Sequence, residues 1–177
     1  GSIEVMTELL SLSNPLAFNR AARIQEYARQ IGKSLGVSDL WQLEVASMLT
    51  HLGYVTIPQE TLEKKNNAKP LEAHESQMFE NLPHISQQLI SHIPRLEPIQ
   101  QIIEKAHAGG SLATISMEDS IAVSTAILRT VIRFDELIEK GYGKAEAIQE
   151  LKLDADYYNQ TILDQLGVIK FHENKVN

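Results

Sequence analysis

The stretch ASMLTHLGYVTIP, residues 46–58, decides how this chain folds. Its first half continues a series of apolar residues at steps of three, which is typical of one face of an α-helix. The series is Leu40, Leu43, Ala46 and Leu49. It predicts a helix over residues 38–52, which Gly53 then ends. Pro58 opens a further short helix, so the stretch predicts two helices joined by a bend.

A longer amphipathic helix is predicted just upstream, over residues 14–35. Asn14 is a favourable N-cap, and Pro15 suits the first helical position because the N–H that it lacks would have no partner there. Small and apolar residues recur along it at steps of four and three. They are Ala17, Ala21, Ile24, Ala28, Ile31 and Leu35.

Downstream of a polar loop at residues 65–70, the apolar spacing again predicts helices only. They cover residues 71–93 with a break near Leu82, 99–108, 116–140, 145–151 and 157–166. The break is expected because Pro83 interrupts the apolar series, and Ser116 is expected to cap the long helix. No alternation of period two is visible. We therefore predict an all-α fold, a bundle of about seven to nine helices.

Composition limits the classes of function. The 177 residues carry a formal net charge of −7, without the basic stripe that phosphate backbones or anionic membranes attract, so we expect no nucleic-acid partner and no membrane binding. No apolar run approaches the ~20 residues that span a bilayer, and no signal peptide is visible. Cysteine is absent, so no disulfide or thiolate metal site can form. A cytoplasmic location fits these features.

The length predicts one domain, residues 14–177. Gly1 and Ser2 resemble a protease-cleavage scar. The rest of residues 1–13 is interpreted as a linker or an N-terminal helix, and a homodimer through its leucines is one expectation for it.

The stretch quoted first resembles the signature of the HD-GYP phosphodiesterases of the HD superfamily, which reads roughly A-x-L-L-H-D-I-G-K-x-x-I-P. The apolar frame, Gly53 and the Ile57–Pro58 ending coincide. In this register the family's histidine falls on Thr50, its aspartate on His51 and its lysine on Tyr54.

The resemblance extends over roughly residues 15–166 and places altered residues at the other site positions. The family's first H-x-x-R-V motif puts its histidine on Arg20, and H-P-x-x-G puts a histidine on Leu82. Where the family has H-H-E and the G-Y-P loop, this chain has a short connection that contains His107. The last motif puts Arg133 where a metal-binding aspartate belongs.

The resemblance therefore implies an HD-like scaffold that has lost its chemistry. Metal-assisted phosphodiester hydrolysis needs two or three cations held by histidines and carboxylates from several helices, and arginines at two ligand positions would repel them. We expect no catalytic residue, no metal and no cofactor. The former metal-site positions are Arg20, Thr50, His51, Leu82, His107 and Arg133.

By the same resemblance, the expected function is a non-catalytic regulatory or protein-binding output module of a bacterial signalling protein. The system would be two-component or related to cyclic di-GMP, with a protein partner or a neighbouring receiver-like domain. Two alternatives stay open. A cyclic di-GMP receptor without hydrolysis would bring Arg20 and Arg133 together in an open pocket, whereas otherwise each arginine would pair with a carboxylate such as Glu104 or Asp135. A divergent metal-dependent phosphodiesterase would use His51, His84 and His107 with Asp135.

Overall fold

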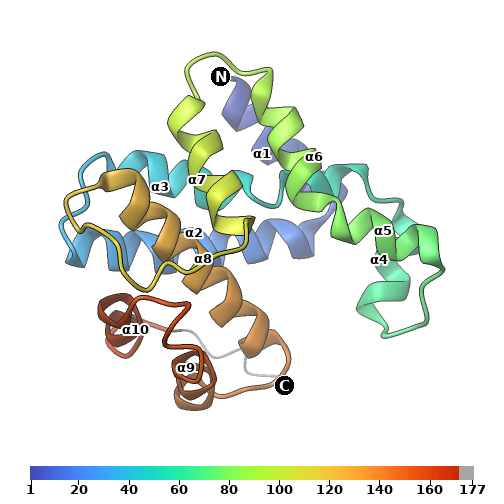
Figure 1. Ribbon diagram of the computed structural model, residues 1–177. Helices are drawn as coiled ribbons and strands as arrows, with labels where there is room; N and C mark the ends of the chain where they lie inside the picture. The colour runs from blue at the N-terminus through green and yellow to red at the C-terminus, as the bar shows by residue number, and fades with distance from the viewer. Residues whose placement is uncertain (172–177) are drawn as a thin grey trace.

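The computed structural model describes residues 1–171, and all regular structure within them is helical (Figure 1). In chain order the elements are α1 (Ser2–Ser13), α2 (Pro15–Ser34), α3 (Leu40–Leu49), the 3-10 helix η1 (Leu52–Thr56), α4 (Gln59–Asn66), α5 (Ala73–Glu80), α6 (Leu82–Ser91), α7 (Glu97–His107), α8 (Ser120–Glu139), α9 (Lys144–Lys152) and α10 (Gln160–Leu166). The all-α prediction is confirmed. The helix at residues 2–13 brings the described α-helices to ten, above the seven to nine expected.

Two helices of 20 residues each, α2 and α8, form the centre of the bundle. Figure 1 shows α8 crossing α2, with α3 and α7 on one side of the crossing and α9 and α10 on the other. α2 begins as predicted: the Asn14 side-chain oxygen accepts a hydrogen bond from the Ala17 N–H at 3.1 Å, and Pro15 follows the cap. Within residues 1–171, every helix is too short or too polar to cross a bilayer.

The apolar spacing predicts a core series made of Ile24, Ile31, Leu43, Leu49, Ile85, Leu89 and Ile127. Most of these residues are buried. Five of them are at most 1% exposed: Ile24, Ile31, Leu43, Leu49 and Ile127. Ile85 and Leu89 are only partly buried, and Ile90 takes the core position instead. The helix is interrupted at Asn81, so the buried face of α6 does not continue that of α5. α6 buries Leu82, Ser86 and Ile90, at steps of four.

Two helix ends differ from the sequence prediction. α3 stops at Leu49, because Gly53 is pressed against α6: its N–H donates to the Ser86 hydroxyl at 2.7 Å, and a Cβ there would lie 2.7 Å from the Leu82 carbonyl oxygen. The cap of α8 is Asp119, not Ser116, since the Asp119 carboxylate accepts from the Ala122 N–H at 3.1 Å.

A buried glutamate joins α4 to α5. The Glu75 carboxylate accepts from Lys64 Nζ at 2.9 Å, from the Thr61 hydroxyl at 3.0 Å and from the Glu72 N–H at 3.0 Å. These bonds hold the pKa of Glu75 at about 2, with the Glu72 N–H as the largest cause. These bonds hold α4 against α5, and the two short helices form one wall of a cleft.

Arg129 ties α8 to the end of α7. Its guanidinium is buried and donates to four backbone carbonyl oxygens at distances of 2.5 to 3.0 Å. These belong to Lys105, Ala106, Ala108 and Gly110. The last carbonyls of a helix have no intrahelical partner, so one side chain here satisfies both the end of α7 and the loop that follows it.

Replacing Arg129 by methionine is expected to lower the free energy of unfolding by about 3 to 5 kcal/mol, because one buried and three partly buried hydrogen bonds from a charged donor to backbone carbonyls are lost. Urea denaturation measures the change. The matched control is Arg133→Met on the same helix. Among residues 1–171, the partly exposed Arg133 side chain forms an ion pair only with its neighbour Glu136, so this substitution should change stability by no more than about 0.5 kcal/mol. Equal effects of the two substitutions would contradict the assignment.

Candidate functional site

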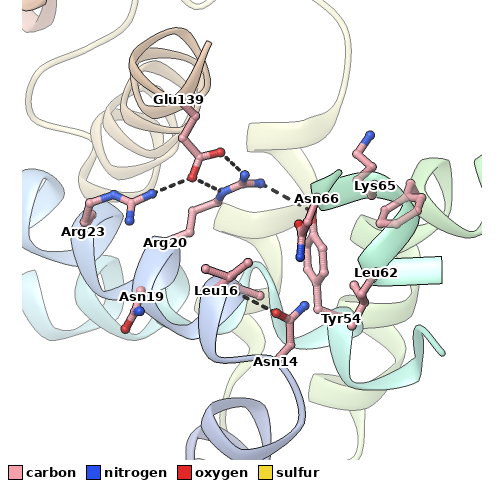
Figure 2. A pocket seen from close by; sticks show the side chains of 12 residues that line it. Asn14, Leu16, Asn19, Arg20, Arg23, Tyr54, Leu62, Lys65, Asn66 and Glu139 are labelled. Carbon is pink, nitrogen blue, oxygen red and sulfur yellow. Dashed lines mark hydrogen bonds and ion pairs between the residues drawn. The ribbon is translucent and has the colours of Figure 1, made fainter. Parts of the chain in front are cut away.

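A cleft of about 410 Å³ lies beside the crossing of α2 and α8, with α4 and α5 as its opposite wall. Figure 2 shows Arg20 and Arg23 from α2 converging on Glu139 from α8, while Tyr54, Leu62 and Lys65 face them. A second hollow of about 440 Å³ shares Arg20, Tyr54 and Lys65 with the first. The two form one continuous polar region at the C-terminal end of α8.

Four charged side chains form a closed network on the α2 side of the cleft. Arg23 donates to both oxygens of Asp135, at 3.0 and 3.1 Å, and to Glu139 at 2.7 Å. Arg20 donates to Glu139 from Nε at 3.1 Å and also from Nη2, and its Nη1 lies 3.5 Å from the Tyr54 hydroxyl. Two guanidinium groups thus balance two carboxylates.

Asp135 is the buried member of this network. Its side chain is 1% exposed, whereas those of Arg20, Arg23 and Glu139 are 26 to 32% exposed. Burial raises the pKa of the Asp135 carboxyl, and the hydrogen bonds and charge of Arg23 oppose that rise. The carboxylate therefore depends on its arginine, and removing Arg23 would leave a buried charge without a partner.

Two histidines lie behind the network and are held neutral. The ring of His51 stacks on Tyr54 with centroids 5.8 Å apart, and its buried Nδ1 has no hydrogen-bond partner within the described part of the chain. Burial is the largest cause that lowers the pKa of His51 to about 3, and the charge of Arg20 is the next, with smaller effects of His107 and Arg23. His107 Nε2 lies 2.7 Å from the Thr50 hydroxyl, and partial burial together with the charge of Arg129 lowers its pKa to about 4.

The structure brings most of the predicted site positions together. Arg20, Thr50, His51 and His107 lie in this region, linked by the contacts just described. Leu82 is 7% exposed and lines the second hollow.

Arg133 does not join them, which corrects the pairing expected from the sequence. It lines neither hollow, and its partner is Glu136 at 3.0 Å, not Glu104 or Asp135. Arg23 holds Asp135 instead, and Arg20 pairs mainly with Glu139, its Nε lying 3.9 Å from Asp135.

Sequence reasoning missed Arg23 and Glu139 as site residues, although a signal existed. Arg20 and Arg23 are three residues apart, and Asp135 and Glu139 are four apart. Each pair therefore projects from one face of its helix. Two such pairs of opposite charge on the two longest helices indicate a cross-helix network.

The side chains present do not fit a divalent metal centre. Across residues 1–171, no three or more His, Asp or Glu side chains are grouped so that they could hold a metal ion, so the set His51, His84, His107 and Asp135 does not assemble. Both oxygens of Asp135 are engaged by Arg23. A cation here would have to displace a guanidinium group.

The described residues thus form a helical bundle with a polar cleft beside its two long, crossing helices. The HD domain family model matches residues 4–162, from α1 into α10, so the chain belongs to the HD domain family. HD domains are often hydrolases. No curated protein and no solved structure matches the chain.

The neutral histidines predict that stability falls as the pH drops from about 6.5 towards 4. Unfolded His51 takes up a proton near pH 6.5, whereas in the folded state its pKa is about 3. The unfolded chain therefore binds more protons in this window, and stability rises with pH. His51 alone should remove roughly 2 to 3 kcal/mol between pH 7 and pH 4.

Thermal or urea unfolding of His51→Gln across this pH range tests the assignment. The variant should show a shallower pH dependence than the parent protein, because glutamine does not titrate. His92→Gln is the control, since His92 is exposed and should leave the slope unchanged. An unchanged slope in His51→Gln would show that another group is responsible.

Proposed function

We propose that this HD domain is a non-catalytic regulatory module that acts by binding a protein partner. The observation that carries the proposal is the network of Arg20 and Arg23 with Asp135 and Glu139. In the register of the HD-GYP resemblance, Arg20 takes the place of a histidine ligand. A guanidinium group therefore stands where the chemistry of hydrolysis would need a metal ligand.

The energetics of the network support the proposal. Arg23 holds Asp135 with two parallel bonds, a geometry that gives strong charge-assisted hydrogen bonds. Breaking such a buried pair from one side costs about 3 to 5 kcal/mol. A metal ion would have to supply that free energy and then overcome repulsion by the positive charges that remain.

The signalling context rests on the resemblance to HD-GYP domains. On that basis the module belongs to a two-component or cyclic di-GMP related protein, and its partner is a neighbouring receiver-like domain or another protein. The acidic balance of the chain, −7 overall, agrees with a protein partner better than with nucleic acid.

The fold should not depend on a metal, and adding a metal should produce no phosphodiesterase activity. We expect no turnover of cyclic di-GMP or of a generic phosphodiester after reconstitution with Mn²⁺, Fe²⁺ or Zn²⁺. We also expect no resolvable change in melting temperature between chelator and saturating metal, whereas a tight site would shift it by about 10 °C. A chelator-sensitive melt with stoichiometric metal by elemental analysis, or turnover abolished by His51→Ala, would restore the hydrolase.

A cyclic di-GMP receptor without hydrolysis is the second candidate. The cleft favours it, because Arg20, Arg23 and Lys65 line a space of about 410 Å³ beside the rings of Tyr54 and Phe79. Two findings weigh against it. The Arg20 guanidinium already donates to Glu139, and Arg133 does not line the cleft but pairs with Glu136.

Calorimetry should therefore give no dissociation constant below about 10 μM for cyclic di-GMP, which corresponds to roughly −7 kcal/mol. The informative pair of variants is Arg20→Ala and Arg133→Ala. Tighter binding that Arg20→Ala removes and Arg133→Ala leaves intact would make the receptor the better description.

A further inference from the structure

Helix α1 is apolar on two opposite faces. Its inner face packs on the core through Leu10, 1% exposed, with Ile3 and Met6 beside it. Its outer face carries Val5, Leu9 and Leu12, which are 56%, 54% and 76% exposed. These three outer-face residues, at steps of four and three, lie on successive turns and form one row. Single exposed apolar side chains need no explanation, but a row along a helix indicates an interaction surface.

The spacing of this outer row fits a second copy of the same helix. Leu9 lies near the middle, with Val5 four residues before it and Leu12 three residues after it. A twofold rotation about Leu9 therefore sets Leu9 against its counterpart and Val5 against Leu12 of the second copy. Steps of four and three are also the spacing by which two helices pack along a narrow seam.

The charges favour the antiparallel arrangement. The charged side chains of α1 are Glu4 and Glu8, both in its first two turns, and α1 has no basic residue. The other end of α1 leads to Leu16, 59% exposed, on the lining of the cleft that also contains Arg20 and Lys65. Lys65 lies over the Phe79 ring, and its ammonium makes no ion pair among residues 1–171.

An antiparallel pair brings the acidic start of each α1 towards the end of the other α1 that leads to the cleft lined by Arg20 and Lys65. A parallel pair would instead set Glu4 against Glu4 and Glu8 against Glu8, which is repulsive. The helix dipoles also oppose each other favourably only in the antiparallel pair.

We propose that the domain forms an antiparallel homodimer through the outer face of α1, with its twofold axis at Leu9. This goes beyond the proposed function and does not depend on it. A 12-residue helix is about 18 Å long, so the buried surface falls at the small end of specific interfaces and the dimer is weak.

Sedimentation equilibrium from about 5 to about 500 μM covers the affinity expected of a small interface. The average mass should rise from 19.8 kDa towards twice that value. Leu9→Glu should weaken association at least about 30-fold, because each copy would bury a carboxylate at the axis. Its melting temperature should stay near that of the parent monomer, since Leu9 points away from the core.

The matched control is Leu153→Glu, at a leucine that is 79% exposed after α9, far from α1 in the sequence. It should dimerise like the parent protein. A protein that stays monomeric at the highest concentration, or a dimer that survives Leu9→Glu, overturns the proposal.

Because the chain contains no cysteine, single engineered thiols report the register. Leu9→Cys should form a disulfide-linked dimer under mild oxidation, and Val5→Cys mixed with Leu12→Cys should form the mixed dimer. Val5→Cys alone should not, since its two copies would be about 12 Å apart along the helix axis. Efficient linkage of Val5→Cys to itself would show a parallel pair and overturn the antiparallel one.

Discussion

The ion network between α2 and α8 is the interaction on which this structure depends. α2 and α8 are the two longest helices, and the other helices pack around their crossing (Figure 1). Charges buried at such a crossing must be paired, because an unpaired carboxylate in the interior costs several kcal/mol. Arg23 makes Asp135 tolerable there, and Arg20 with Glu139 closes the network at the surface (Figure 2). Side chains of α2 and α8 therefore neutralise one another's charges in this region.

The neutral state of His51 and His107 follows from the charges of the arginines around them. A proton on His51 would add a third positive charge beside Arg20 and Arg23 on a ring whose Nδ1 is buried, so the imidazole stays neutral. His107 is constrained from the other side by Arg129, whose charge is committed to the carbonyls at the end of α7. Both rings are thus held by arginines that serve helix packing.

Much of the fold was predictable because its signals are local. Asn14 with Pro15, the break before α6 and the long apolar run of α8 each depend on neighbouring residues only. The site was less predictable, because a motif register gives a position along a helix but not its direction in space. Each residue along a helix rotates the side-chain direction by about 100°. The Arg133 side chain therefore points about 160° away from that of Asp135, whereas Glu139 lies within about 40° of Asp135. That rotation explains why Arg133 pairs with Glu136 at the surface while α2 supplies the partner of Asp135.

The same geometry shows how the helices of this HD domain are linked where α2 and α8 cross. A metal centre of the HD type would draw ligands from several helices and so would link them. Arg20 and Arg23 provide that link, because each guanidinium reaches from α2 to a carboxylate of α8. Gly53 and the Ile57–Pro58 ending serve a different need, the close approach of η1 to α6. These residues match the family signature because they are required for packing, and packing is needed whether or not a metal binds.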